Sequence, residues 1–524
     1  MLLSQRAREK YISRKFRSFT WMKDLSEKDL KEALSKERLR PRFKTAPWLH
    51  QLVCFYIGLC EPRFLFLLDM GAGKSKILMD LLTHHIRTKR AQRGLVVVPR
   101  LINIGSWQED VERHSDLKVC MVSMESIEEK WKALSTSDAD LLLIDYQGLT
   151  LALSKKKKGG GLSLDQKKVQ QLAKRLDFVG VDEIHKVKNH QSLWFRTVDS
   201  LASKVTFCYG TTGTLFGKDP EDLWSQFHLV DHGDTFGDNL GLFRATFYST
   251  KPHPWKREER TFIKSTAPLL NRMIQNYSIR YNEREFSTVP EPIFVRRNLP
   301  LTNDQREAIL QALDGFLGCG DDLQEMDSQW FRMRQIAAGY MGWSDEYGDH
   351  VKPFKETPKI DLLESILEDA GDSKVVISYE YTDTARLIIS KLLEPHKIGY
   401  RWLWSGTKDP IQARKDFLTK EDVRVFLMNS ESGGTGVDGL QKVSRYLVLF
   451  ESPSSPITRK QVIKRIHRPG QEERAYVYDL VAKGTPDVTI LESVSEGIDV
   501  HDSVVDQNSR KAIALKLKKL VAEG

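Results

Sequence analysis

The chain has few cysteines and no long hydrophobic run, and each shortage excludes a class of protein. Its five cysteines are scattered through 524 residues and never form a Cys-x-x-Cys pair. This spacing argues against a zinc ribbon, an iron–sulfur cluster or a disulfide framework, and it favours a reducing compartment. No apolar stretch approaches the roughly 20 residues that a membrane-spanning helix needs, and the first residues lack the hydrophobic core of a secretion signal. We therefore expect no membrane partner, no zinc and no iron–sulfur cluster.

Acidic side chains are also fewer than basic ones, 71 against 80, which gives a net charge of +9 at pH 7. A modest basic excess fits a polyanionic partner, although many proteins carry one for solubility alone. The length predicts about three structural units. Residues 1–45 are expected to form a basic arm, helical from Glu27 to Leu39, and their composition also resembles a transit segment.

Beyond this arm, short apolar runs alternate with helical segments in two parts of the chain. We predict a first lobe over residues 46–290, a helical insertion and lobe crossing over 291–355, a second lobe over 356–490 and a helical tail over 491–524. The alternation predicts two α/β lobes, each with a parallel sheet covered on both faces. In the tail, Arg510 to Val521 is expected to form a basic amphipathic helix on the second lobe. The predicted strands are 64–68, 95–98, 141–144, 178–181 and 205–209 in the first lobe, and 374–379, 400–404, 423–428, 446–450 and 476–479 in the second.

A strand, a glycine turn and a helix follow one another from Phe64 to Leu82, and this arrangement is typical of a phosphate-binding loop. The turn is Gly71-Ala72-Gly73-Lys74-Ser75. Glycines allow backbone N–H groups to surround phosphate oxygens, and the helix N-terminus adds partial positive charge. Lys74 would reach the β- and γ-phosphates, and the Ser75 hydroxyl would hold Mg²⁺. The full pattern has a further glycine where this chain has Leu68. Along the same helix, His84 and His85 are expected to be surface residues.

Two carboxylates, Asp182 and Glu183, follow the apolar run Phe178–Val181. Open α/β sheets bind ligands at the carboxyl ends of their strands. Asp182 could hold Mg²⁺, and Glu183 could orient or deprotonate the attacking water. An acidic turn after a strand is the alternative, but it is less favoured because an earlier strand of the same lobe ends in the glycine-Lys-Ser loop.

Gln461, Arg465 and Arg468 are spaced at i, i+4 and i+7, so on a helix they share one face. Paired arginines suit a γ-phosphate whose charge spreads during transfer. A solvated basic helix is the alternative. A separate basic run, Lys155–Lys158, precedes three glycines, so residues 155–161 are predicted to form a solvated loop, with contact to a nucleic-acid backbone as the sharper alternative.

Taken together, the motifs resemble those of helicase superfamily two. The particular residues within them resemble its Swi/Snf-type branch of DNA translocases, in a minimal bacterial or phage-like form. The resemblance covers about residues 47 to 486. It rests on the following segments, in this order: Leu49-His50-Gln51, Met70 to Ser75, Val97-Val98-Pro99 with Ser106-Trp107, Asp182 to Asn189, Thr212-Gly213-Thr214, Ile279-Arg280, Ser432 to Val437, Gln461 to Gln471, and Arg474 to Leu480.

This resemblance implies two RecA-like lobes that hydrolyse ATP with Mg²⁺ in the cleft between them. It implies that Gln51 recognises adenine, that Gly71, Ala72, Gly73, Lys74 and Ser75 bind the phosphates, and that Ser75 and Asp182 bind Mg²⁺. Lys74, Asp182, Glu183, Gln461, Arg465 and Arg468 would be catalytic, the last two completing the site from the opposite lobe. His185, Thr212, Gly213 and Thr214 would couple nucleotide state to lobe closure. Arg100, Tyr146, Ser378 and Thr435 fall near motifs that face the nucleic-acid backbone.

The chain departs from the branch at Val437-Asp438-Gly439-Leu440, where the family usually has Gly-Asn-Leu. Asp438 resembles the equivalent aspartate of helicases outside the branch, and we include it among the ATP-binding residues. It also departs after Gly213, where Leu215-Phe216-Gly217 replaces the proline and asparagine of many members.

The leading hypothesis is an ATP-driven translocase or remodelling motor on double-stranded or branched DNA, and a protein bound to that DNA would be a further partner. Alternatives on the same motor are a branch-migrating, annealing or unwinding helicase, and an RNA-dependent ATPase. An ATP-gated scaffold with negligible turnover is an alternative of another class. We expect a monomer in the cytoplasm of a bacterial or phage-infected cell, or in the nucleus or mitochondrion of a eukaryote.

Overall fold

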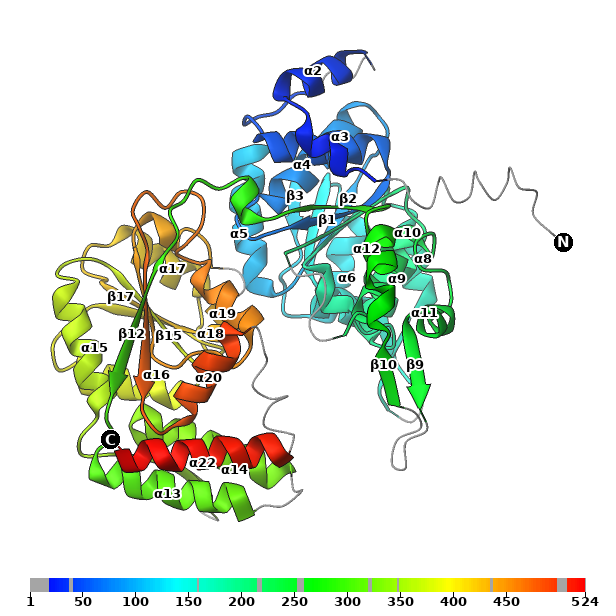
Figure 1. The fold of residues 1–524 in the computed structure, drawn as a ribbon. Coiled ribbons are helices and arrows are strands. Elements are labelled where there is room, and N and C mark those ends of the chain that lie inside the picture. The colour runs from blue at the N-terminus through cyan, green and yellow to red at the C-terminus, as the bar shows by residue number, and fades with distance from the viewer. Residues whose placement is uncertain are drawn as a thin grey trace. The chain divides into compact units, whose positions relative to one another are not determined.

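The described residues of this computed structural model fall into two compact units, residues 1–287 and 288–524. Each unit is a RecA-like α/β lobe built on one parallel sheet (Figure 1), as the strand and helix pattern predicted. Within the described residues, no helix combines the length and the apolar composition that crossing a membrane requires. The structure describes residues 18–36, 41–157, 160–213, 219–251, 259–318, 323–345, 348–433, 437–496 and 507–523.

The sheet of the first unit has seven strands in the order β11-β1-β8-β7-β2-β4-β3, all parallel. Alternate residues of β1 face opposite sides, so Phe64, Phe66 and Leu68 join one apolar cluster while Leu65 and Leu67 join another. Burial on both faces explains why these strands are continuous apolar runs. The strands are β1 Arg63–Leu68, β2 Gly94–Val98, β3 Val119–Met121, β4 Leu141–Asp145, β7 Phe178–Asp182, β8 Phe207–Thr212 and β11 Ser278–Tyr281.

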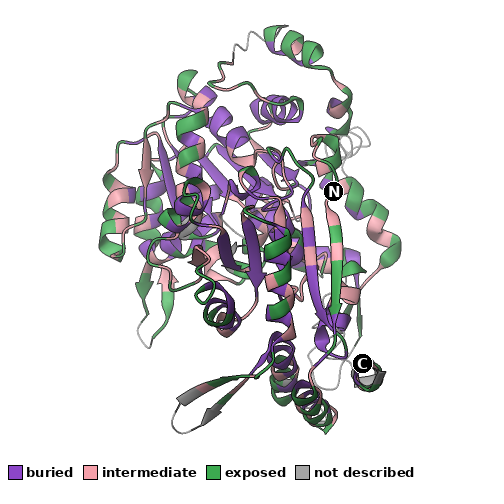
Figure 2. Cartoon of the chain, turned by 90° about the vertical axis from the view of Figure 1, so that its left-hand side faces the viewer, coloured by how far each residue is buried: buried purple, intermediate pink, exposed green. Residues whose placement is uncertain are grey.

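Helices cover both faces of this sheet, and many of them are buried on one side and exposed on the other (Figure 2), whereas α3 is buried from His50 to Leu59. Helices α3, α4 and α5 contribute to one apolar cluster, and α6 to α12 contribute to the other. Their bounds are α3 Leu49–Cys60, α4 Lys74–Arg87, α5 Leu101–His114, α6 Ile127–Thr136, α7 Tyr146–Ala152, α8 Gln166–Ala173, α9 Leu193–Ala202, α10 Asp222–Asp231, α11 Leu240–Phe247 and α12 Ala267–Ile274. A hairpin, β9 Tyr248–Lys251 with β10 Glu259–Phe262, follows α11.

Three local expectations for the first unit change. His84 and His85 were expected on the surface, but both are buried, because α4 carries apolar residues on most of its circumference. The expected loop 155–161 is in part a hairpin, β5 Ser154–Lys156 with β6 Leu162–Leu164, whose lysines 155–157 are exposed. The described part of the basic arm, a 3₁₀ turn Thr20–Asp24 and α2 Glu27–Lys36, buries Phe19, Met22, Leu30 and Leu34 in the core of the unit.

The sheet of the second unit has six parallel strands in the order β12-β19-β18-β15-β17-β16. Its edge strand β12, Ile293–Leu299, lies in the stretch that the sequence assigned to a helical insertion. Prolines on both sides and the polar Arg296, Arg297 and Asn298 hid this strand, because an edge strand does not need an apolar outer face. The other strands are β15 Val375–Tyr379, β16 Tyr400–Leu403, β17 Val425–Asn429, β18 Tyr446–Leu449 and β19 Tyr476–Ala482.

The helices between β12 and β15 belong to the core of the second unit. Ile309 and Leu313 of α13 share one apolar cluster with Ile377 of β15, and the C-terminal helix α22 adds Ala514 and Leu517 to it. Residues 291–355 therefore fold with the second sheet. The helices are α13 Asn303–Gly318, α14 Leu323–Ala338, α15 Pro358–Asp369, α16 Thr382–Ile388, α17 Pro410–Thr419, α18 Ser430–Gly433, α19 Pro456–Ile463, α20 Pro486–Ser495 and α22 Gln507–Glu523, and a hairpin pairs β13 Tyr340–Asp345 with β14 Gly348–Pro353.

Candidate active site

The glycine turn joins the end of β1 to the start of α4. Gly71 and Gly73 adopt the left-handed conformation, with φ of 83° and 73°, which glycine reaches without steric cost. A Cβ atom on Gly73 would lie 2.3 Å from Nε2 of Gln51, so only glycine fits there. No side chain caps α4, which begins at Lys74. Its first backbone N–H groups are therefore available to a phosphate, and this geometry fits a nucleotide.

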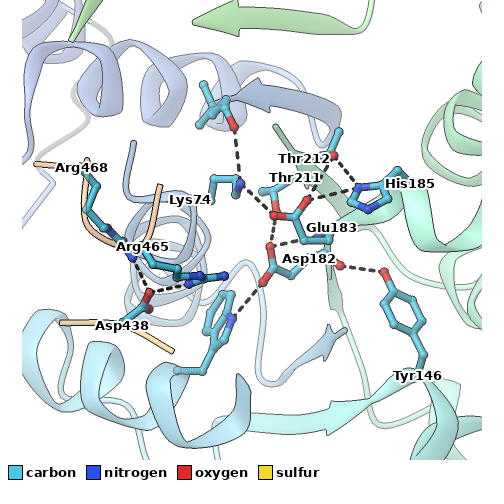
Figure 3. A network of polar contacts seen from close by, with 12 residues as sticks. Lys74, Tyr146, Asp182, Glu183, His185, Thr211, Thr212, Asp438, Arg465 and Arg468 are labelled. Atoms are coloured by element: carbon cyan, nitrogen blue, oxygen red, sulfur yellow. Dashed lines mark hydrogen bonds and ion pairs between the residues drawn. The ribbon is translucent and has the colours of Figure 1, made fainter. Parts of the chain in front are cut away.

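Lys74 lies beside the acidic residues at the end of β7 (Figure 3). Its Nζ is 3.0 Å from Oε1 of Glu183, and both side chains are largely buried. Burial would raise the pKa of Glu183, but Lys74 and His185 outweigh this effect and hold the pKa of that carboxyl well below its usual range. The structure thus keeps Glu183 ionised, which a residue that orients or deprotonates water requires.

Asp182 is fixed by three donors. Its Oδ2 accepts a hydrogen bond from Nε1 of Trp107 at 3.1 Å, and its Oδ1 accepts from Oγ1 of Thr211 at 2.9 Å and from the backbone N–H of Glu183 at 3.0 Å. Burial raises the pKa of Asp182, and the Glu183 charge raises it further. Ser75 donates to Oδ2 of Asp110 at 2.5 Å. Mg²⁺ prefers oxygen ligands such as hydroxyls and carboxylates, so the Ser75 hydroxyl and the Asp182 carboxylate fit that ion.

Gln51 is buried on the first turn of α3, directly against the glycine turn. Its Nε2 donates to the carbonyl oxygen of Ala72 at 3.0 Å, and its Oε1 accepts from the backbone N–H of Trp48 at 2.9 Å. The neighbouring His50 also has Nε2 2.8 Å from the Ala72 oxygen. The helix that carries the expected adenine contact therefore also holds the phosphate loop.

The candidate coupling residues form one chain of contacts from β7 to β8. Thr212 donates to Oε2 of Glu183 at 3.2 Å, and its Oγ1 lies 2.9 Å from Nδ1 of His185. His185 is itself 3.3 Å from Glu183 Oε2. Gly213 ends the described part of this segment, and Thr214 lies outside the described residues.

In the second unit, the Asp438 carboxylate binds both candidate arginines (Figure 3). Asp438 Oδ1 accepts from Nη1 of Arg465 at 3.1 Å and from Nη1 of Arg468. Burial would raise the pKa of Asp438, but Arg468 and Arg465 hold it well below its usual range. Asp438, which we expected to bind ATP, is in this structure the partner of both guanidinium groups.

The expected helical face of Gln461, Arg465 and Arg468 is wrong in one respect. Helix α19 ends at Ile463, so only Gln461 is helical and both arginines lie in the turns that follow. The backbone N–H of Arg465 already bonds to Val462 O, a tighter i to i−3 turn. Further on, Pro469 disfavours a helical conformation at Arg468, so one regular helix is not favoured through both arginines.

The four nucleic-acid candidates do not behave alike. Arg100 is exposed at the start of α5. Tyr146 is only 1% exposed, stacks on Trp194 and donates to the carbonyl oxygen of Asp182 at 2.8 Å. Ser378 is 0% exposed inside β15. In this structure the side chains of Tyr146 and Ser378 are therefore buried in the core of their units, and neither is exposed to a nucleic-acid backbone. Thr435 lies outside the described residues.

Three residues that contact the site were given no role from the sequence: Trp107, which was named only as part of a family motif, Asp110 and Thr211. Trp107 and Asp110 are spaced by three on α5, so they share a helix face. Their shared helix face, with a carboxylate one turn from an indole N–H, was the signal that could have identified these two. Thr211 directly precedes Thr212, and it donates to Asp182 where Thr212 donates to Glu183.

Two RecA-like lobes, with a phosphate loop after β1 and an acidic pair after β7, define the chain as an ATPase domain of the helicase type. A family model described as the SNF2-related domain matches residues 17–329, more than half of the chain. The chain belongs to this family.

Among characterised relatives, the chromatin-remodeling ATPase INO80 of Cryptococcus neoformans is 28% identical over 175 residues, 32% of this chain and 10% of that protein. Chromodomain-helicase-DNA-binding protein 1 of Homo sapiens is 21% identical over 467 residues, 84% of this chain and 25% of that protein. The chain thus spans a tenth to a quarter of these relatives. A solved structure described as the Sulfolobus solfataricus SWI2/SNF2 ATPase core in complex with dsDNA aligns with 92% of this chain and 98% of that one, at 17% identity and a TM-score of 0.40.

Proposed function

We propose that the chain is an ATP-driven motor that translocates along double-stranded DNA and remodels what is bound to it. One observation carries the proposal of hydrolysis: Oε1 of Glu183 lies 3.0 Å from Nζ of Lys74, beside an uncapped phosphate loop. A carboxylate in this position can act on a water molecule next to the terminal phosphate, which a protein that only binds ATP does not need.

In this proposal, Lys74 exchanges Glu183 for the β- and γ-phosphates, and Gln51 recognises adenine from α3. The N–H groups of Gly71, Ala72, Gly73 and the start of α4 surround the phosphate oxygens. Ser75 and Asp182 would hold Mg²⁺, which neutralises phosphate charge during transfer. Glu183 then orients or deprotonates water, while Thr212, Gly213 and His185 relay the state of Glu183 to the end of β8.

Arg465 and Arg468 of the second unit, with Gln461, are proposed to act on the same nucleotide. Their shared partner Asp438 fixes two guanidinium groups in one place, so little entropy is lost when they meet a phosphate. An arginine supplied to a γ-phosphate can raise the rate by about 10³ to 10⁵. Hydrolysis would then depend on both units, which is how ATP turnover becomes motion.

DNA is the proposed partner because the chain belongs to the SNF2-related family, and the human relative's name includes DNA binding. Among the described members of the four nucleic-acid candidates, Arg100 is exposed and fits a backbone contact. Contacts of this kind carry little sequence information, so affinity should depend strongly on salt and weakly on sequence. We propose a monomer that works where its DNA lies, in the cytoplasm of a bacterial or phage-infected cell, or in the nucleus or mitochondrion of a eukaryote.

The test is steady-state ATPase activity without nucleic acid and with single-stranded DNA, duplex DNA, four-way DNA and RNA. We expect duplex DNA to stimulate hydrolysis most, and Lys74→Ala to abolish it under every condition. Equal rates with and without duplex would contradict the motor. Stronger stimulation by RNA would favour an RNA-dependent ATPase. Displacement of a third strand from a triplex, without separation of the duplex, would distinguish translocation from unwinding.

A further inference from the structure

Helix α5 touches both residues that are proposed to hold Mg²⁺. Asp110 accepts the Ser75 hydroxyl at 2.5 Å, and Trp107 donates its Nε1–H to Oδ2 of Asp182 at 3.1 Å. Because Trp107 and Asp110 are three residues apart on one helix, they present both contacts from the same face. Ser75 and Asp182 come from α4 and β7, so α5 joins two elements that carry one site.

Each contact fixes a different degree of freedom. Thr211 and the Glu183 backbone hold Oδ1 of Asp182, and Trp107 holds Oδ2, so the carboxylate cannot rotate. A hydroxyl has one proton to donate. When Ser75 gives that proton to Asp110, its oxygen lone pairs are turned away from Asp110 and stay available to a cation.

Helix α5 does not depend on these polar contacts for its position. Ile104 and Val111 are each 2% exposed, and both belong to the apolar cluster on that face of the sheet. Burial of these two side chains stabilises the helix against the sheet independently of its polar contacts. Removing one hydrogen bond from α5 should therefore leave the helix in place and alter only what it positions.

We propose that Asp110 and Trp107 are positioning residues for magnesium: Asp110 orients the Ser75 hydroxyl, and Trp107 orients the Asp182 carboxylate. The proposal rests on the proposed use of Mg²⁺–ATP. Both residues act through a partner side chain, Asp110 through Ser75 and Trp107 through Asp182. The Asp110 carboxylate also places negative charge one hydrogen bond away from Ser75, and this charge favours the binding of a divalent cation.

The experiment measures the affinity for a fluorescent ATP analogue in EDTA and at increasing Mg²⁺. For Asp110→Ala and Trp107→Phe, we expect affinity in EDTA to remain within about twofold of the unmodified protein, while the Mg²⁺ concentration for half-maximal enhancement rises about tenfold, a typical effect of losing a residue that orients a metal ligand. Asp110→Asn keeps the shape and one acceptor oxygen, so its shift should be smaller. Glu109→Gln, an exposed carboxylate on the same helix, should shift nothing.

A double-mutant comparison separates positioning from a general structural effect. If Asp110 acts through the Ser75 hydroxyl, Asp110→Ala should add little to Ser75→Ala, because the group that Asp110 orients is already gone. Additive shifts, or a normal Mg²⁺ response in Asp110→Ala, would overturn the proposal. If the unmodified protein binds the analogue with no Mg²⁺ enhancement, the proposed function fails instead, and the two failures are therefore distinguishable.

Discussion

Oε1 of Glu183 lies 3.0 Å from Nζ of Lys74, and the two side chains are 14% and 13% exposed. This ion pair joins the phosphate loop after β1 to the acidic turn after β7, across the intervening strand β8. The same lysine also reaches the carbonyl oxygen of Leu68 at 3.4 Å. A phosphate that binds Lys74 would therefore have to displace Glu183 from it.

Replacing Glu183 with Gln should abolish hydrolysis and preserve binding. The amide cannot accept a proton, and loss of such a residue typically lowers the rate by about 10²- to 10⁴-fold. ATP affinity should be equal or higher, because Lys74 no longer has to leave a carboxylate before it binds phosphate. Single-turnover hydrolysis and analogue binding measure the two effects separately.

The matched control is Glu129→Gln, an exposed glutamate on α6, which should change neither quantity. Unchanged turnover in Glu183→Gln would remove Glu183 from the chemistry. A parallel loss of binding would instead show that its main role is to maintain the loop.

Replacing Asp438 with Ala should lower both the stability of the second unit and the rate of ATP hydrolysis, because it removes the shared partner of Arg465 and Arg468. Arg465 is only 8% exposed, and it would lose its carboxylate partner. Leaving a buried polar group poorly satisfied costs about 1 to 3 kcal/mol. Denaturant unfolding should show this loss, and kcat should fall while KM for ATP stays nearly constant, because the arginines are proposed to act during transfer. Asp438→Asn retains one acceptor and should be affected less; equal kcat in all three proteins would contradict this role.

Much of the fold followed from the sequence, because buried parallel strands must be continuous apolar runs. All ten predicted strands are present, with end points that shift by up to three residues. The phosphate loop and the acidic pair were equally visible, since both are contiguous in sequence. A contiguous motif needs only local structure to bring its residues together.

What the sequence did not show depends on contacts between distant residues. Strand β12 was missed because only its pairing with β19 reveals it. The arginines were placed on a helix, whereas their position is set by Asp438, which precedes them by about thirty residues. Tyr146 and Ser378 were placed near nucleic acid, although neighbouring elements bury them. Periodicity reports which face of an element is apolar, but not which element covers it.

Lysines 155–157 of the β5–β6 hairpin provide a test of the DNA interaction that the sequence left open. All three are exposed. If they bind phosphates, replacing all three lysines by Gln should reduce the slope of the logarithm of the DNA-binding constant against the logarithm of the salt concentration. The reduction should be about 0.9 for each phosphate that is no longer neutralised. Replacing them with Arg keeps the charge and should keep the slope. A solvated hairpin that does not bind DNA would give the same slope in all three proteins.

Arg334 of α14 should be important for the stability of the second unit. It is 4% exposed, donates to the Ser452 carbonyl oxygen at 2.9 Å and to Ser454 Oγ at 3.2 Å, and lies 3.8 Å from Glu380. Replacing it with Met should lower the free energy of unfolding by about 3 kcal/mol, because the half-buried Glu380 loses its cation and the Ser452 carbonyl loses its donor. Asp327→Asn, an exposed change on the same helix, should have little effect. A thermal unfolding midpoint equal to that of the control would contradict the prediction.

The buried imidazole of His85 should make the first unit less stable in mild acid. Burial, together with the charges of Arg90 and His84, lowers the pKa of His85 to about 3. Its ring stacks on Phe207, with centroids 3.9 Å apart. In the unfolded chain an ordinary histidine takes up a proton near pH 6.5. The unfolded state therefore binds more protons than the folded state below that pH, and stability must fall as the pH falls.

Between pH 7 and pH 5 this difference amounts to about 2 kcal/mol for one histidine. His85→Phe keeps an aromatic ring against Phe207 and removes the titrating group, so the loss of stability over this interval should shrink by about that amount. Denaturant unfolding of the unmodified protein and the variant at both pH values measures it. His396, which is largely exposed and contacts Glu364, provides the control, since His396→Gln leaves the buried imidazole unchanged. Identical pH dependence in His85→Phe and the unmodified protein would show that His85 takes up its proton in the folded state, and the packing around Phe207 would then have to admit a charge.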